Sequence, residues 1–149
     1  MQAAERTVAS VMRREFASLC EDDHLDLADS VMELGRVRHL PVIDAAGRVV
    51  GIVSNRDLLE ASLTSVLALE PAQRRAFLHS VRVAEVMTRH VETIAPDALL
   101  VSAANRMLSH RIGCLPVVDA SGSMIGLLTE SDLLAVAYGA RSAGAGDAP

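Results

Sequence analysis

The chain has 149 residues, a formal net charge of −5 and a hydrophobic fraction of 50%, which is typical of a folded globular protein. That length accommodates one compact domain or two small ones, without room for a catalytic domain beside a regulatory one. The acidic balance and the scarcity of aromatic residues argue against a nucleic-acid partner, which favours a basic face and stacking side chains. No apolar run reaches the length of a membrane span, no signal peptide is recognisable, and two cysteines form no disulfide framework, so we expect a cytoplasmic protein.

The dominant feature of the sequence is an internal repeat with a constant offset of 75 residues. Aligning residues 8–63 with residues 83–138 gives 20 identical pairs in 56 positions. The recurring segments include Val-Met at 11–12 and 86–87, Leu-Pro-Val at 40–42 and 115–117, and Asp-Leu-Leu at 57–59 and 132–134. Self-similarity of this kind predicts two copies of one structural unit.

In chain order, each copy begins with a short apolar stretch and an amphipathic helix. Residues 16–19 and 91–94 are the apolar stretches, and each predicts a short strand. The helix of the first copy is expected to have an apolar face at three- and four-residue spacing, made by Leu27, Val31 and Leu34 with Ala28 and Met32. The corresponding face of the second copy is made by Leu100, Ala103, Ala104, Met107 and Leu108.

Two further strands and a closing helix complete each copy. Strands are predicted at residues 40–43 and 49–53, joined by a compact turn at 44–47 that ends in a glycine. The second copy repeats this pattern at residues 115–118, 119–122 and 124–128. A helix then begins near Asp57 in the first copy and near Asp132 in the second. The predicted order is therefore β-α-β-β-α, twice, which is a mixed α/β (α+β) fold.

The stretch between the copies, residues 64–80, has no counterpart after the second copy. Pro71 followed by Ala-Gln-Arg-Arg-Ala-Phe-Leu predicts a helix with proline in its first turn. This segment is either a plain connector or an insertion that covers one face or contacts a partner. The tail at 141–149 is small and polar, and we expect it to be flexible.

The best-defined polar motif is Ser54-x-x-Asp57, repeated as Thr129-x-x-Asp132, with a glycine three residues before each hydroxyl. One interpretation is a capping box, in which hydroxyl and carboxylate satisfy free N–H groups at a helix N-terminus. The other is a ligand site, since a helix N-terminus suits a phosphate and a carboxylate accepts hydrogen bonds from two ribose hydroxyls. The glycine favours the ligand site, because it leaves room for close backbone approach.

The tandem pattern Val-Met, Leu-Pro-Val-Ile/Val-Asp, Gly and Gly-h-h-Ser/Thr-x-x-Asp-Leu-Leu (h, apolar) resembles a pair of CBS domains, a Bateman module, here expected to stand alone. The resemblance covers residues 8–63 and 83–138. It implies one repeat at residues 1–63, a linker at 64–80 expected to be helical, and a second repeat at 81–140. It further implies that the repeats pack sheet to sheet with pseudo-two-fold symmetry, leaving clefts for AMP, ADP, ATP or S-adenosylmethionine, and that the module forms a homodimer.

The resemblance also assigns roles to the two polar motifs. The carboxylate that binds ribose in the family matches Asp57 and Asp132. The hydroxyl near the phosphate matches Ser54 and Thr129.

Other site residues follow from the same comparison of motifs. The segment beside the adenine matches Thr93, Ile94 and Pro96, whereas the first copy lacks the proline. Basic residues before Leu-Pro-Val match Arg38 and His39, which we expect to serve a nucleotide whose ribose is held by the carboxylate of the second repeat. Further candidates for phosphate are Arg56, Arg14 and Arg89.

No pattern in the sequence indicates catalysis or a metal site. The five histidines show no ligand spacing, and no nucleophile–base arrangement, Walker loop or GxGxxG motif is present. Cys114 is expected to be a small buried hydrophobe.

The leading hypothesis is a regulatory module, not an enzyme, that binds an adenosine-containing nucleotide and signals to an effector protein by a conformational shift. The alternative is a structural or protein-interaction dimer without a nucleotide, in which the two carboxylates act only as helix caps.

Overall fold

A computed structural model describes residues 5–65 and 70–139, so the tail at 141–149 lies outside the described residues. The chain divides into two compact units. The first unit comprises Ala17–Val91, and the second comprises Glu92–Pro149 together with Met1–Phe16. Each unit has a two-stranded antiparallel sheet and helices, which confirms the predicted mixed α/β class. The units do not coincide with the sequence repeats, because the Val-Met segment of each copy belongs to the unit built on the other copy.

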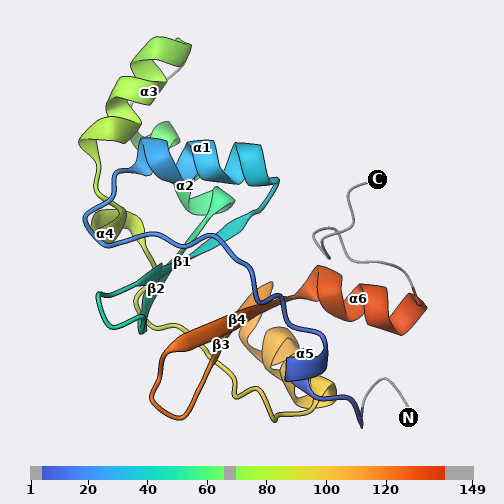
Figure 1. The fold of residues 1–149 in the computed structure, drawn as a ribbon. Helices are drawn as coiled ribbons and strands as arrows, with labels where there is room; N and C mark the ends of the chain where they lie inside the picture. The colour runs from blue at the N-terminus through green and yellow to red at the C-terminus, as the bar shows by residue number, and fades with distance from the viewer. Residues whose placement is uncertain (1–4, 66–69, 140–149) are drawn as a thin grey trace. The chain divides into compact units, whose positions relative to one another are not determined.

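The first unit is a hairpin covered by helices (Figure 1). Its elements are α1 (Leu25–Gly35), β1 (His39–Ile43), β2 (Val49–Ser54), α2 (Asn55–Ser65), α3 (Pro71–Ser80) and α4 (Val83–Val86). Figure 1 shows α1 and α2 on one side of the β1–β2 hairpin.

The second unit has the same plan. A 3-10 helix, η2 (Val8–Ser10), precedes α5 (Leu100–His110), β3 (Cys114–Val118), β4 (Met124–Thr129) and α6 (Glu130–Tyr138). The η2 segment is held by backbone hydrogen bonds from Val8 N to Ala98 O (2.8 Å) and from Ala9 N to Pro96 O (2.9 Å). Among the described residues, no helix of either unit is long and apolar enough to cross a membrane.

The turns between the paired strands follow the prediction. Asp44 Oδ1 accepts hydrogen bonds from the N–H groups of Ala46 and Arg48, both at 2.9 Å, and Gly47 has a φ of 80°. Asp119 and Gly122 (φ 86°) form the same turn between β3 and β4. A side chain that bonds its own turn backbone explains why Asp-x-x-Gly marks both hairpins.

The strands predicted at 16–19 and 91–94 are reduced to single parallel bridges, Leu19 with Val42 and Ile94 with Val117. Leu19 N donates to Pro41 O and Leu19 O accepts from Ile43 N, both at 2.9 Å. Extending this ladder toward the N-terminus requires an N–H from residue 41, which proline lacks. Pro116 stops the ladder of Ile94 in the same way.

The buried faces of the two equivalent helices agree with the predicted ones in part. The face of α1 that enters the core of the first unit is Leu25, Ala28 and Met32, and that of α5 in the second unit is Leu100, Ala103 and Met107. The predicted core residues Leu34 and Leu108 are 86% and 78% exposed. On α1, Leu25 belongs to the buried stripe and was not predicted, whereas Leu34 lies outside it. On α5, all three buried residues were predicted, and Leu108 lies outside the stripe that they form.

The glycine before each Ser/Thr-x-x-Asp motif makes room for a methionine of the same unit, not for a ligand. A Cβ on Gly51 would lie 2.5 Å from Met87 Sδ, and a Cβ on Gly126 would lie 2.5 Å from Met12 Sδ and 3.1 Å from Arg13 O. Both methionines are buried, at 7% exposure. The expected role of the glycines in ligand approach is therefore replaced by a packing role.

Helix α3, in the predicted linker, packs on α1 and α2 of the first unit. Arg74 donates to both carboxylate oxygens of Asp29, at 2.9 and 3.1 Å, and His79 Nδ1 lies 2.8 Å from Asp26 Oδ2. Burial alone would raise the pKa of Asp26, but the hydrogen bond and charge of His79 outweigh it and lower that pKa. Leu78 is buried in the core of the unit. The segment thus covers one face of the first unit.

Gly126→Ala is expected to destabilise the chain by about 1–3 kcal/mol, because the new methyl group overlaps Met12 and crowds the Arg13 carbonyl. Urea unfolding measures the change in free energy. Gly35→Ala is the control, since its Cβ would meet Val37 no closer than 3.8 Å and an alanine suits a helix better than a glycine. Equal stability of the Gly126→Ala variant and the wild type would contradict the packing role.

Candidate functional site

Each unit places a reciprocal capping box at the point where its second strand meets a helix. In the first unit, Ser54 N donates to Asp57 Oδ2 (2.7 Å) and Asp57 N donates to Ser54 Oγ (3.1 Å). In the second, Thr129 N donates to Asp132 Oδ2 (2.9 Å) and Asp132 N donates to Thr129 Oγ1 (3.3 Å). The capping interpretation is therefore realised in both copies, and one oxygen of each carboxylate is left for another partner.

The two carboxylates differ in what meets that second oxygen. Asp132 Oδ1 accepts from Arg13 Nε and lies 3.1 Å from both Nε and Nη2 of that residue. Asp132 is 1% exposed and is a buried charged residue of the second-unit core region. Asp57 is partly exposed, and among the described residues no side chain donates to it. Arg13 is thus a site residue that the motif comparison missed.

The basic residues before Leu-Pro-Val lie beside the capping box of the first unit. His39 pairs with Ser54 across the β1–β2 hairpin, and Arg38 O accepts a hydrogen bond from Asn55 N (2.8 Å) at the start of α2. The side chains of Arg38 and Arg56 are exposed. The structure therefore gathers Arg38, His39, Ser54, Arg56 and Asp57 around one helix N-terminus, where the helix dipole and the arginines favour an anion.

The segment predicted to lie beside the adenine belongs to the second unit. Thr93 O accepts a hydrogen bond from Arg106 Nη1, Ile94 is buried against β3, and Pro96 O accepts from Ala9 N. The expected joint action of Arg38 and His39 with the carboxylate of the second repeat links residues of both units and stays a prediction.

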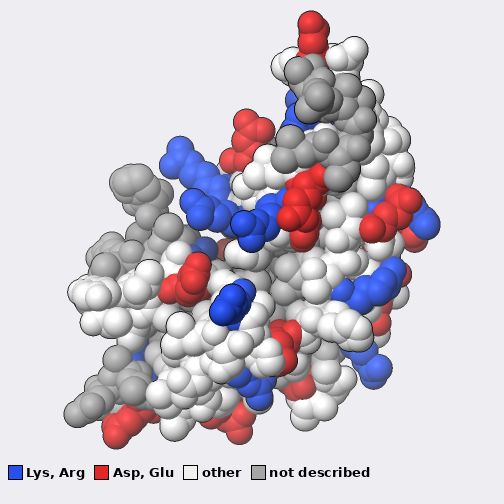
Figure 2. Space-filling view, turned by 180° about the vertical axis from the view of Figure 1, so that it is seen from behind, with Lys and Arg blue, Asp and Glu red and all other residues white. Residues whose placement is uncertain are grey.

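The two further phosphate candidates have different surroundings. Arg14 is exposed and makes no side-chain hydrogen bond or ion pair among the described residues. Arg89 donates to Ala84 O (3.3 Å) and lies 3.7 Å from Glu21 Oε1. Figure 2 shows acidic and basic side chains interspersed on the visible surface. Among the described residues, no three His, Cys, Asp or Glu side chains are grouped as a metal site.

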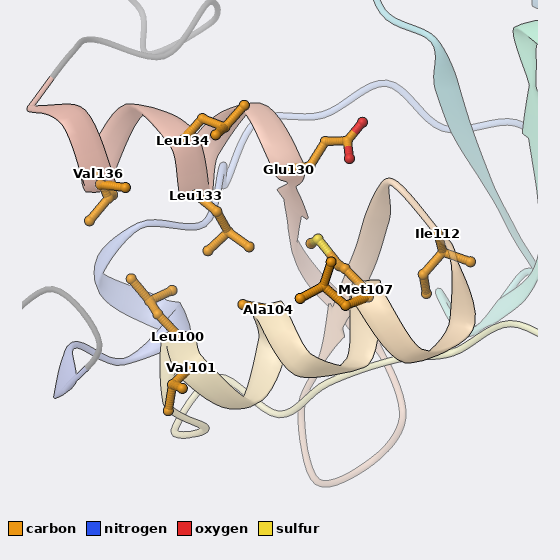
Figure 3. Close-up of a pocket in the computed structure, with 11 residues that line it drawn as sticks. Leu100, Val101, Ala104, Met107, Ile112, Glu130, Leu133, Leu134 and Val136 are labelled. Atoms are coloured by element: carbon orange, nitrogen blue, oxygen red, sulfur yellow. The ribbon is translucent and has the colours of Figure 1, made fainter.

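A second candidate surface is an apolar cavity of about 500 Å³ between α5 and α6 (Figure 3). Its walls include Ala104, Met107, Leu133 and Val136, with Glu130 at one end. Leu108 and Leu134 border it and are 78% and 57% exposed. The sequence pattern assigned several of these residues to the core, so the openness of the groove was not predicted.

The model of the CBS domain family matches residues 8–64 and 83–139. The chain belongs to the CBS-domain family. A protein of Vibrio cholerae described as an acetoin utilization protein (AcuB) is 35% identical, with a TM-score of 0.76, covering 90% of this chain and 91% of that one. The structure of CBSX2 in complex with AMP is 28% identical, with a TM-score of 0.75, covering 89% of this chain and 96% of that one.

A homoserine O-acetyltransferase of Methanococcoides burtonii is 35% identical over 127 residues. The alignment covers 85% of this chain but 23% of that protein, so the chain spans about a quarter of the relative's length. The comparisons confirm the predicted CBS-domain pair and its fold. A pair of this kind is a regulatory module.

Cys114 is expected to be unreactive toward thiol reagents at pH 8, in contrast to Cys20. Burial and the nearby negative charge of Glu130 raise the pKa of Cys114 to about 12, so almost none of it is thiolate at that pH. Cys20 is exposed and serves as the internal control. Labelling with Ellman's reagent should modify one thiol per native chain and two in urea, and two fast-reacting thiols in the native chain would contradict the assignment.

Proposed function

We propose that the chain is a regulatory module that binds an adenosine-containing ligand, AMP, ADP, ATP or S-adenosylmethionine, and signals its occupancy to an effector protein. The observation that carries the proposal is the cluster at the start of α2, where Asp57 lies near Arg38, His39 and Ser54. One carboxylate oxygen of Asp57 accepts no hydrogen bond from the described residues. A carboxylate suits ribose hydroxyls, and a helix N-terminus with arginines suits a phosphate. The likeness to CBSX2, which was crystallised with AMP, supports this choice of ligand class.

The mechanism is a shift of population between two conformations. A ligand that binds one conformation more tightly than the other shifts the equilibrium toward the first conformation. The free energy of this shift cannot exceed the difference between the free energies with which the ligand binds the two conformations. Such a device needs no catalytic group, and we propose that the chain itself catalyses no reaction. The interspersed surface charge and the apolar groove suit protein partners rather than nucleic acid.

Calorimetric titration with AMP, ADP, ATP and S-adenosylmethionine tests the proposal, with GMP as the control for the base. We expect saturable binding of at least one adenosine compound. The double variant D57N/D132N should weaken it about 10- to 150-fold, since each ribose loses a charged acceptor while an asparagine oxygen can still cap the helix. Absence of binding to all four compounds would refute the nucleotide proposal and favour the alternative, a structural or protein-interaction dimer.

We further propose that a second copy of the chain covers the α5–α6 groove. In the first unit the equivalent face carries acidic residues, Asp26, Asp29 and Glu33, and two of them hold α3. The aligned positions on α5 are Val101, Ala104 and Leu108, which offer no charge to a basic helix. The exposed side chains of Leu108 and Leu134 border the α5–α6 groove, whose lining includes Ala104. They can pack between the same residues of a second copy that is related by a two-fold axis.

Leu108→Glu is therefore expected to convert a dimer into a monomer, because it buries a carboxylate in the contact between copies. Light scattering coupled to size-exclusion chromatography gives the mass of each species. Leu34→Glu is the matched control, since Leu34 is 86% exposed on α1 of the other unit and should leave the dimer intact. A monomeric wild type, or equal effects of the two substitutions, would contradict the proposed interface.

A further inference from the structure

Arg13 and Thr88 occupy equivalent backbone positions in the two units. They are 75 residues apart, the offset of the repeat. Arg13 exchanges two backbone hydrogen bonds with Leu127, both at 2.9 Å, and Thr88 exchanges two with Ile52, at 2.9 and 3.0 Å. The backbone pairing is the same in each unit, so the difference between the two positions lies in the side chain.

In the second unit, that side chain takes the remaining oxygen of the capping carboxylate. Arg13 Nε and Nη2 both lie 3.1 Å from Asp132 Oδ1, while Oδ2 already accepts from Thr129 N. The side chain of Arg13 is 18% exposed and that of Asp132 is 1% exposed. Both oxygens are engaged, and the guanidinium shields the carboxylate from solvent.

In the first unit the equivalent carboxylate is open. Thr88 is exposed, and its short side chain makes no hydrogen bond to Asp57. Asp57 Oδ2 accepts from Ser54 N (2.7 Å), which leaves Oδ1 for a donor that the described residues do not supply. The carboxylates of the two motif copies therefore differ in their availability to a ligand, because the aligned position is Arg13 in the second unit and Thr88 in the first.

We propose that Arg13 is a specificity-determining latch: it occupies Asp132 and restricts adenosine-ligand binding to Asp57, so that one chain takes one ligand. Ribose hydroxyls donate hydrogen bonds to a carboxylate, so a ligand at Asp132 must first displace the charge-assisted hydrogen bond from Arg13 Nε and the ion-pair contact of Nη2. A ligand at Asp57 meets no such competitor among the described residues. This inference rests on the proposed function and assigns its site to Asp57 of the first unit, in place of the carboxylate of the second repeat that the motif comparison paired with Arg38 and His39.

The test is calorimetric titration of the full chain with AMP. The wild type should bind one AMP per chain, and D57N should weaken that binding about 10- to 150-fold. Arg13→Thr copies the residue of the first unit and should raise the stoichiometry to two, and R13T/D57N should retain one AMP, now at Asp132. Thr88→Arg copies the latch into the first unit and should weaken wild-type binding at least about tenfold.

Urea unfolding shows whether each variant is folded. Arg13→Thr leaves a buried carboxylate without its partner, so this variant can fail to fold. In that case Thr88→Arg decides, because the exposed Thr88 side chain makes no hydrogen bond among the described residues that the substitution would remove. A stoichiometry of one in folded R13T, or undiminished AMP binding in T88R or D57N, would overturn the latch. Absence of AMP binding in every form would instead overturn the proposed function on which the latch rests.

Discussion

Each unit depends on a Val-Met segment that is distant in sequence from the strands it joins. Met12 fills the space above Gly126, and Arg13 pairs with Leu127, which places residues more than a hundred positions apart in direct contact. In the first unit, Met87 fills the space above Gly51 and Thr88 pairs with Ile52, and the residues of each pair are 36 positions apart. Because a Cβ at either glycine would collide with the methionine, the fit is specific rather than merely hydrophobic. The same pairing brings the side chain of residue 13 to the capping carboxylate.

The two repeats share a backbone plan but expose different chemistry on their helix pairs. On α1, Asp26 and Asp29 receive His79 and Arg74 of α3, so the chain covers this face with its own helix. The raised pKa of Arg74, caused first by its hydrogen bond to Asp29, is consistent with a lasting ion pair. On α5 the aligned positions are apolar and border an open groove. Divergence at a few surface positions therefore separates a face that α3 covers from one that stays open among the described residues.

The repeat was visible in the aligned sequence. Local patterns were sufficient to predict the Asp-x-x-Gly turns and to offer the capping boxes as one of two interpretations, since both depend on residues within one turn. Leu34 and Leu108 were misassigned to the core because a helical pattern does not say which of two adjacent stripes is buried. The strand at 16–19 was overestimated because the proline that ends its ladder lies in the partner strand. Arg13 was missed because its partner is 119 residues away. Only the mismatch of Arg13 with Thr88 in the aligned repeats could have indicated it.

The Arg13–Asp132 pair also limits what a ligand could accomplish in the second unit. Removing one partner of a buried ion pair costs about 3–5 kcal/mol, and partial exposure of Arg13 places its own contribution at or below the lower end. Part of the binding free energy of a ligand at Asp132 would thus be consumed in opening the pair. Only free energy that differs between two conformations can shift their populations. The open carboxylate of Asp57 is therefore the better place from which a ligand can drive a conformational change.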